Sequence, residues 1–175
     1  YWIALKAVEE VGCVGFRTLL AAFGSPEAVF RASTATLQVI PGIGPKTAEH
    51  IRSFSDWEMA EREVALAGKL GIAVVTCQDP LYPKNLLNIY DYPPFLYVRG
   101  SFAQEIAVAI VGSRLASAYG KYITEKLARQ LAMQGITVVS GLARGIDSAA
   151  HRGALAGKGR TIAVLGCGLD IVYPP

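Results

Sequence analysis

Two glycine loops that each carry an arginine are the part of this sequence best suited to chemistry. The first is Gly112-Ser113-Arg114, and the second runs from Gly141 to Asp147 and includes Arg144. Glycine lets the backbone approach a ligand closely, and arginine can grip phosphate oxygens with two parallel N–H groups. These residue types predict a binding site for phosphate or for a phosphodiester backbone.

The elements around the loops explain why they should lie together. Apolar segments typical of buried strands, 106–111 and 136–140, precede the two loops, and the helix-period segment 117–134 joins them. Two buried strands joined by a helix form a βαβ unit in a parallel sheet, and ligands of such sheets bind beyond the carboxyl ends of the strands. We therefore expect both loops at one edge of a Rossmann-like α/β sheet with helices on both faces.

The predicted site also takes in helix starts and a third glycine loop. Ser117 is a natural N-cap, so the positive end of its helix points at the first loop. A third apolar strand, 161–165, ends in a loop that contains Gly166 and Gly168. The predicted DNA- or phosphate-binding set is Gly112, Ser113, Arg114, Ser117, Gly141, Ala143, Arg144, Gly145, Asp147, His151, Gly166 and Gly168.

Two interpretations of Asp147 and His151 stay open, since both lie on one face of a predicted helix. They could form an acid/base pair of an enzyme. Alternatively, Asp147 caps the helix and orients the loop while His151 hydrogen-bonds a neighbour, which we favour because no nucleophile stands nearby. The spacings of a dinucleotide fingerprint and of a P-loop are both absent. We expect no cofactor and no catalytic residue.

Residues 1–70 are predicted to form short helices around a tight turn. The stretch Ile40-Pro41-Gly42-Ile43-Gly44-Pro45-Lys46 resembles a helix-hairpin-helix motif of the SAM-like kind, and 11–16 repeats it in degenerate form. The glycines permit the hairpin, and the N–H groups of the following helix are free for a phosphate. Gly42, Gly44 and Lys46 are therefore a secondary DNA-binding set.

An alternative for this hairpin is a packing or protein-interaction module that has lost its ligand. Five acidic residues follow the turn and would repel phosphates: Glu49, Asp56, Glu58, Glu61 and Glu63. We favour this alternative over DNA binding.

Residues 71–104 form a proline- and tyrosine-rich connector that we expect to pack on the second domain, 105–175. Proline suppresses helices, so short extended segments are predicted at 72–76 and 96–98. The aromatic residues Tyr82, Tyr92, Phe95 and Tyr97 could stack on bases, but packing of an ordered loop is the interpretation we favour.

Composition excludes several classes of protein. With 52% hydrophobic residues among 175, disorder is not expected, and no apolar run is long enough to span a membrane. The first residues do not resemble a signal peptide. Three cysteines without a CxxC pair, and two histidines, predict no metal site and no disulfide framework. Residues 71–175 hold ten Lys/Arg against six Asp/Glu, so an anionic partner is expected there.

Together these motifs resemble the DprA (DNA processing protein A, or Smf) family over essentially the whole chain. The residues that carry the resemblance are Val111-Gly112-Ser113-Arg114, the stretch from Ser140 to Leu155 with Arg144, Asp147 and His151, the stretch from Thr161 to Pro174 with Gly166 and Asp170, and the upstream Tyr82-Pro83, Leu96-Tyr97 and Gly100.

The resemblance implies a cytoplasmic, non-enzymatic protein that binds and protects incoming single-stranded DNA during natural transformation and loads RecA onto it. It implies a basic DNA pocket at Gly112, Ser113 and Arg114, and a homodimer of the full-length protein. The family's sheet continues with further strands after Tyr173-Pro174, so we expect this chain to be truncated. The alternative is a nucleotide-binding enzyme of the phosphoribohydrolase type, which usually needs a glutamate base; Glu105 and Glu125 are the glutamates of the second part.

Overall fold

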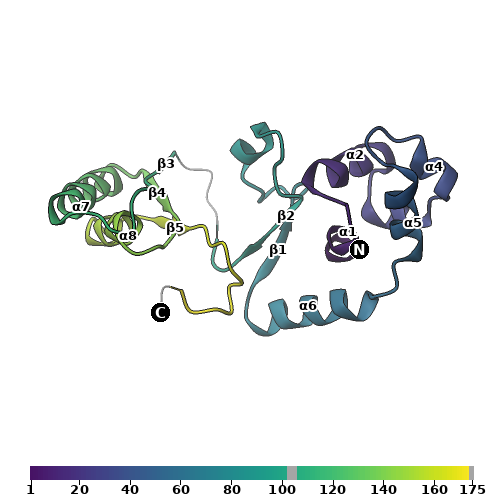
Figure 1. Cartoon of the computed structure of the whole chain (residues 1–175). Helices are drawn as coiled ribbons and strands as arrows, with labels where there is room; N and C mark the ends of the chain where they lie inside the picture. Colours follow the sequence, from purple (N-terminus) through teal and green to yellow (C-terminus); the bar gives the residue numbers. More distant parts are fainter. Residues whose placement is uncertain (102–105, 174–175) are drawn as a thin grey trace. The chain divides into compact units, whose positions relative to one another are not determined.

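The computed structural model describes residues 1–101 and 106–173. The chain divides into two compact units, Tyr1–Phe102 and Ala103–Pro175 (Figure 1). The prediction of three segments, 1–70, 71–104 and 105–175, stays a prediction, and the first boundary falls inside the first of these units.

The first unit begins with six short helices: α1 (Trp2–Ala7), α2 (Cys13–Phe23), α3 (Pro26–Arg31), α4 (Thr34–Gln38), α5 (Pro45–Ser53) and α6 (Trp57–Lys69). Local capping explains where three of them start. The side chain of Ser25 accepts a hydrogen bond from the backbone N–H of Ala28, and Ser33 and Asp56 do the same at the starts of α4 and α6. The helices surround a core in which Leu5, Phe16 and Leu19 are fully buried.

The connector adds a two-stranded antiparallel sheet to this unit. Strand β1 (Ala73–Thr76) pairs with β2 (Phe95–Val98), and the 3-10 helix η1 (Lys84–Asn88) lies between them in the chain. Its described contacts tie it to helices of the first unit. The guanidinium of Arg17 donates to the carbonyl of Tyr90, 2.5 Å away, and lies 5.1 Å from the ring centre of Tyr92. The amide of Gln78 donates to the carbonyl of Gly24.

The expectation that residues 71–104 pack on the second domain stays a prediction. Within the first unit, Arg17 on α2 offers the connector both a cation–π partner and a hydrogen-bond donor. Nothing in the connector's sequence indicates that partner.

The second unit is a parallel α/β sheet, as the sequence predicts. Its elements are β3 (Ala107–Ala109), α7 (Ala118–Met133), β4 (Thr137–Ser140), α8 (Ile146–Ala156) and β5 (Thr161–Ala163). The strand order is β3-β4-β5, and both neighbouring pairs are parallel. The register aligns Ala109, Val139 and Ile162 in one row across the sheet.

The sheet is parallel with packed helices, as expected, and the two helices within the described residues of this unit cover one of its faces (Figure 1). Each crossover moves one strand further in the same direction, and right-handed crossovers then place their helices on the same side. Val138 faces the helices and is fully buried. Its neighbour Val139 and the residues in its row face away; Ala109 is exposed and Ile162 is half-buried.

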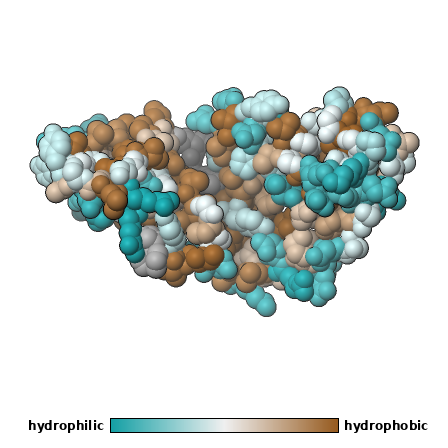
Figure 2. All heavy atoms as spheres, in the orientation of Figure 1, coloured by the Kyte–Doolittle hydropathy of each residue, from teal (hydrophilic) through white to brown (hydrophobic). Residues whose placement is uncertain are grey.

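Hydrophobic side chains reach the surface of the second unit, where Figure 2 shows brown residues on the face drawn. The large exposed ones near the strands and their loops are Ile106, Val108, Val111, Leu115, Val164, Ile171 and Val172.

Helices α7 and α8 meet along a seam of small residues. The core between them and the sheet consists of Ala128, Ala132, Val138, Ala150 and Ala154. A Cβ atom added to Gly153 would lie 2.9 Å from the Cβ of Ala128, and one added to Gly157 would lie 2.7 Å from the carbonyl oxygen of Arg129. The two helix backbones can approach this closely only because glycine stands at these positions.

Candidate functional site

The two arginine-bearing loops lie against each other at the carboxyl ends of β3 and β4. The backbone N–H of Gly112 donates to the Oδ1 atom of Asp147 at 3.3 Å, and the backbone N–H of Ile146 donates to the carbonyl of Ser113 at 3.2 Å. A Cβ on Gly112 would lie 2.7 Å from the side chain of Ile146. The two loops therefore lie together, as the sequence predicts. We call this edge of the sheet the rim.

The first loop presents polar groups to solvent. Ser113 and Arg114 are exposed, and the hydroxyl of Ser113 accepts a hydrogen bond from the backbone N–H of Leu115 at 3.1 Å. Ser117 is the N-cap of α7, as predicted, and its hydroxyl accepts from the backbone N–H of Gly120 at 3.1 Å. The positive end of α7 therefore lies beside the loop.

The second loop has a backbone shape that depends on glycine. Gly145 has a φ of 89° and is the N-cap of α8. The expectation that Asp147 caps this helix is therefore wrong. Ala143 is buried, and its carbonyl accepts a hydrogen bond from the hydroxyl of Ser148. Arg144 is exposed at the tip of the loop.

Asp147 lies beneath the rim rather than on it. Only 7% of the residue is exposed, and its carboxylate is directed at the first loop through Gly112. A Cβ added to Gly141 would lie 2.8 Å from the Oδ2 atom of Asp147. This contact is the one expected if Asp147 orients the loop, and the membership of Asp147 in the DNA-binding set stays a prediction.

His151 is also buried, with 6% of the residue exposed. The hydroxyl of Thr161 donates to the carbonyl of Val138, so the Nδ1 atom of His151 donates to the Thr161 oxygen at 2.6 Å. Burial lowers the pKa of His151, and the charge of Asp147 opposes this shift. This neutral, buried ring supports the interpretation of His151 as a hydrogen-bonding neighbour better than that of a phosphate ligand.

The third loop starts beside the second. The backbone N–H of Val164 donates to the carbonyl of Ser140 at 2.9 Å, which carries the end of β5 to the same edge of the sheet. Gly166 and Gly168 follow in exposed positions. All three predicted loops therefore leave the sheet at one edge.

The sequence analysis missed two residues that shape the rim. The side chain of Ile146 fills the space next to Gly112, and the hydroxyl of Ser140 donates to the carbonyl of Ile110 at 2.6 Å, which joins the ends of β3 and β4. The contact of Ser140 could have been suspected from the sequence, because a serine ends an otherwise apolar strand there. The contact of Ile146 could not, because an apolar residue in the first turn of a helix is common.

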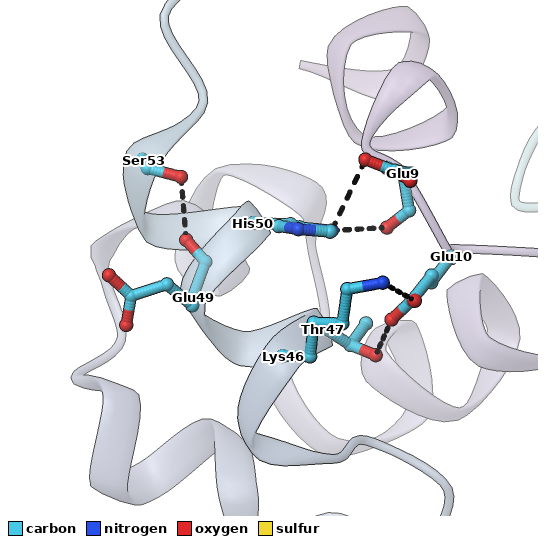
Figure 3. Close-up of polar contacts among 7 residues, drawn as sticks. All are labelled: Glu9, Glu10, Lys46, Thr47, Glu49, His50 and Ser53. Atoms are coloured by element: carbon cyan, nitrogen blue, oxygen red, sulfur yellow. Dashed lines mark hydrogen bonds and ion pairs between the residues drawn. The ribbon is translucent and has the colours of Figure 1, made fainter.

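The hairpin of the first unit has its lysine already paired (Figure 3). Gly42 has a φ of 83° and Gly44 is the N-cap of α5, as the motif requires. The ammonium of Lys46 lies 2.6 Å from the carboxylate of Glu10, which also accepts a hydrogen bond from the hydroxyl of Thr47.

This pairing shifts both groups toward their charged forms. The hydrogen bond from Lys46 lowers the pKa of Glu10, and the same bond raises the pKa of Lys46. The chain's own carboxylate thus lies where the motif would offer a lysine to a phosphate. This contact supports the packing or protein-interaction alternative.

The connector aromatics mostly pack against the protein. Tyr82 is 3% exposed, its hydroxyl donates to the carbonyl of Pro93, and burial raises its pKa to about 12. The rings of Phe95 and Tyr97 meet edge to face, with 5.6 Å between their centres. These contacts agree with the packing interpretation rather than with base stacking.

Other kinds of site can be tested within residues 1–101 and 106–173. No group of three or more His, Cys, Asp or Glu residues there could hold a metal ion, and no helix there is long and apolar enough to cross a membrane. Cys13, Cys77 and Cys167 are free and half-buried. Of the two glutamates considered for an enzyme, Glu105 lies outside the described residues, and Glu125 lies 3.5 Å from Arg152.

Comparisons with known proteins show which family the chain is similar to. Residues 73–175 match the family model of DNA recombination-mediator protein A, and residues 3–54 match that of a SAM-like helix-hairpin-helix tandem. Protein Smf of Synechocystis is 37% identical over 185 aligned residues, which cover 100% of this chain and 46% of that protein. DNA processing protein DprA of Streptococcus pneumoniae is 46% identical over 98 residues, which cover 55% of this chain and 34% of that protein.

A solved structure has a similar fold. The X-ray structure of DNA processing protein A from Streptococcus pneumoniae superposes with a TM-score of 0.63 and 26% identity, over 94% of this chain and 61% of that one. The chain belongs to the DNA recombination-mediator protein A family, also called DprA or Smf. It spans about half the length of the curated relatives it matches.

Proposed function

We propose that this chain is the part of a recombination mediator that binds single-stranded DNA at the rim. The observation that carries the proposal is the joint between the loops: Gly112 and Asp147 hold together two exposed segments that each carry an arginine. Arg114 and Arg144 can bind phosphates, while the positive end of α7 beside the first loop adds to the attraction.

Charge supports a polyanionic ligand. Residues 103–175 hold eight Lys/Arg and four Asp/Glu, and one of those carboxylates, Asp147, is buried beneath the rim. A single strand is favoured over a duplex because, within residues 1–101 and 106–173, the rim is an edge of loops from which neither a helix nor a strand projects to enter a major groove.

Family membership supports a wider role, which is part of the same proposal. The full-length protein protects incoming single-stranded DNA in the cytoplasm during natural transformation, loads RecA onto it, and works as a homodimer. None of these steps needs catalysis by this chain. A test of the RecA step is strand exchange by RecA on DNA coated with single-strand-binding protein, with and without the full-length mediator; no stimulation would contradict it.

An enzyme of the phosphoribohydrolase type remains the second candidate. It would use Asp147 and His151, which lie one turn apart on α8. Both side chains are buried, and each has a partner within the fold, Gly112 for Asp147 and Thr161 for His151. Release of free base from nucleoside monophosphates would favour this candidate over DNA binding.

The test of the main proposal is fluorescence anisotropy with a labelled single-stranded oligonucleotide over a range of salt concentrations. Arg114→Ala should weaken binding by about 1–3 kcal/mol, the range for a lost hydrogen bond to a charged group. Arg62→Ala, on α6 of the first unit, is the matched control and should bind normally. Affinity that is independent of salt, or normal binding by Arg114→Ala, would overturn the proposal.

A further inference from the structure

We propose that the exposed side of α7 extends the rim into a second contact surface for the same nucleic-acid strand. This basic track consists of Lys121, Tyr122, Lys126 and Arg129. The inference rests on the proposed function at the rim and adds a path for the strand beyond it. It predicts that the protein holds long strands by contacts that short strands do not reach.

The basic track is a groove rather than scattered surface charge. Lys121 and Arg129 are two helical turns apart in one stripe of α7, and Tyr122 and Lys126 form the adjacent stripe. An open groove of about 510 Å³ runs between these stripes and the end of α8; its lining residues are Lys121, Tyr122, Glu125, Lys126, Arg129 and Ala156.

The charges of the track are available to a ligand. Glu125 is the carboxylate in the groove, and it lies 3.5 Å from Arg152 of α8. Within the described part of the chain, Lys121, Lys126 and Arg129 form no ion pair. Three exposed cations around one engaged carboxylate leave a net positive groove, which suits a polyanion.

The track begins at the rim. The backbone N–H of Lys121 donates to the carbonyl of Ser117, the N-cap residue, at 3.0 Å, so Lys121 lies one turn from the first loop. Arg129 lies about 12 Å further along the helix axis, at 1.5 Å per residue. A strand bound at the Gly112-Ser113-Arg114 loop can therefore continue along α7.

An aromatic residue and a rigid support favour nucleic acid over an acidic protein segment. Tyr122 is 63% exposed between two cations, a position from which its ring can stack on a base. The backbone of α7 is held against α8 by the close approach of Gly153 and Gly157. The cations thus project from an element that cannot move away from the rim independently.

The experiment compares single-stranded oligonucleotides of two lengths, roughly 6 and roughly 20 nucleotides; the first is near the lower end of the site sizes of single-strand-binding folds and the second exceeds their upper end. The triple variant Lys121→Gln, Lys126→Gln, Arg129→Gln should bind the long strand at least about tenfold more weakly. It should reduce the salt slope of binding by about 2, at about 0.7 per lost phosphate contact. Its affinity for the short strand should stay within about twofold.

The control removes the same charge elsewhere: Lys6→Gln, Lys69→Gln, Lys84→Gln changes three exposed lysines of the first unit and should leave both affinities unchanged. Tyr122→Ala should weaken binding of the long strand, and Tyr122→Phe should restore it. Circular dichroism of each variant confirms folding.

The outcomes separate the track from the rim. If the short strand binds and depends on Arg114, but the triple variant binds the long strand normally, the track is wrong and the rim stands. If the unmodified chain binds neither strand, the proposed function itself fails. Equal weakening for both lengths, or tight binding of polyglutamate that the triple variant abolishes, would overturn the track in favour of general charge or of an acidic protein partner.

Discussion

Asp147 and Gly112 are joined across 35 positions of the chain by one hydrogen bond, from the backbone N–H of Gly112 to the carboxylate of Asp147. The bond ties the first turn of α8 to the loop after β3. Asp147 is almost completely buried, so this contact is sheltered from water. The geometry of the rim depends on it more directly than on either exposed arginine.

The first prediction concerns this bond. Asp147→Ala leaves the N–H of Gly112 without its acceptor, so the free energy of unfolding should fall by about 1–3 kcal/mol. Binding of single-stranded DNA should fall as well, although Asp147 itself is not exposed. Asp147→Asn keeps an acceptor of similar shape and should lose less of both. Urea denaturation and anisotropy measure the two effects; equal behaviour of the Ala and Asn variants would show that the hydrogen bond does not matter.

A second prediction concerns the seam between α7 and α8. Gly153→Ala places a methyl group 2.9 Å from the Cβ of Ala128 and against the carbonyl of Glu125, so the helices must separate. The expected loss in the free energy of unfolding is about 1–3 kcal/mol, as for other overpacked positions. Gly68→Ala on α6, where a Cβ meets no atom within 4 Å, is the control and should be neutral or stabilising. Comparable destabilisation by both variants would contradict the seam.

The third prediction is a pH dependence caused by His151. Burial lowers its pKa in the folded state below the ordinary value of 6.5, so the unfolded chain binds the proton more readily. The stability contributed by the neutral ring is therefore fully present above pH 6.5 and is lost as the pH falls through the folded-state pKa.

Comparison with His151→Asn isolates this effect, because the amide can still donate toward Thr161 but does not titrate in this range. Urea midpoints measured at several pH values should decline more steeply below 6.5 for the unmodified chain than for the variant. The other histidine, His50, has a partly exposed side chain and serves as the control position. Parallel pH profiles for the unmodified chain and His151→Asn would rule the effect out.

The fourth prediction concerns the hairpin. Lys46→Gln should leave binding of single-stranded DNA within about twofold, because Glu10 already compensates the lysine charge. Glu10→Gln removes that compensation and should strengthen binding at low salt, and adding Lys46→Gln should reverse the gain. Anisotropy in an Arg114→Ala background makes the hairpin's contribution visible. A large loss in Lys46→Gln alone would show that the hairpin contacts DNA directly.

The sequence is a good guide to the elements of the second unit and a poor guide to their partners. Apolar strands that end in glycine loops predict β3, β4 and β5 and the common edge of their loops, because period and turn chemistry are local properties. The position of α7 and α8 on one face is not local. It follows from the strand order, which the pattern of apolar residues does not specify.

The predicted site residues fall into an exposed group and a buried group, and residue type alone does not predict which group a residue joins. Arg114 and Arg144 stand exposed at the rim, whereas Asp147 and His151, one turn apart on α8, lie beneath it. A carboxylate and an imidazole have the same sequence signature whether they bind a ligand or a neighbouring backbone. The pairing of Lys46 with Glu10 could not be predicted from the sequence either, because the two residues are 36 positions apart in the chain.

The alanine-rich core between α7, α8 and the sheet limits the stability of the second unit against heating. Burial of apolar area stabilises a fold by roughly 25 cal/mol per Å², and an alanine methyl offers far less area than the Phe16, Leu5 and Leu19 side chains at the centre of the first unit. Warming should therefore loosen the rim while the six helices still hold together. In a longer relative, any further chain that covers the open face of the sheet would set the temperature range in which the DNA-binding edge keeps its shape.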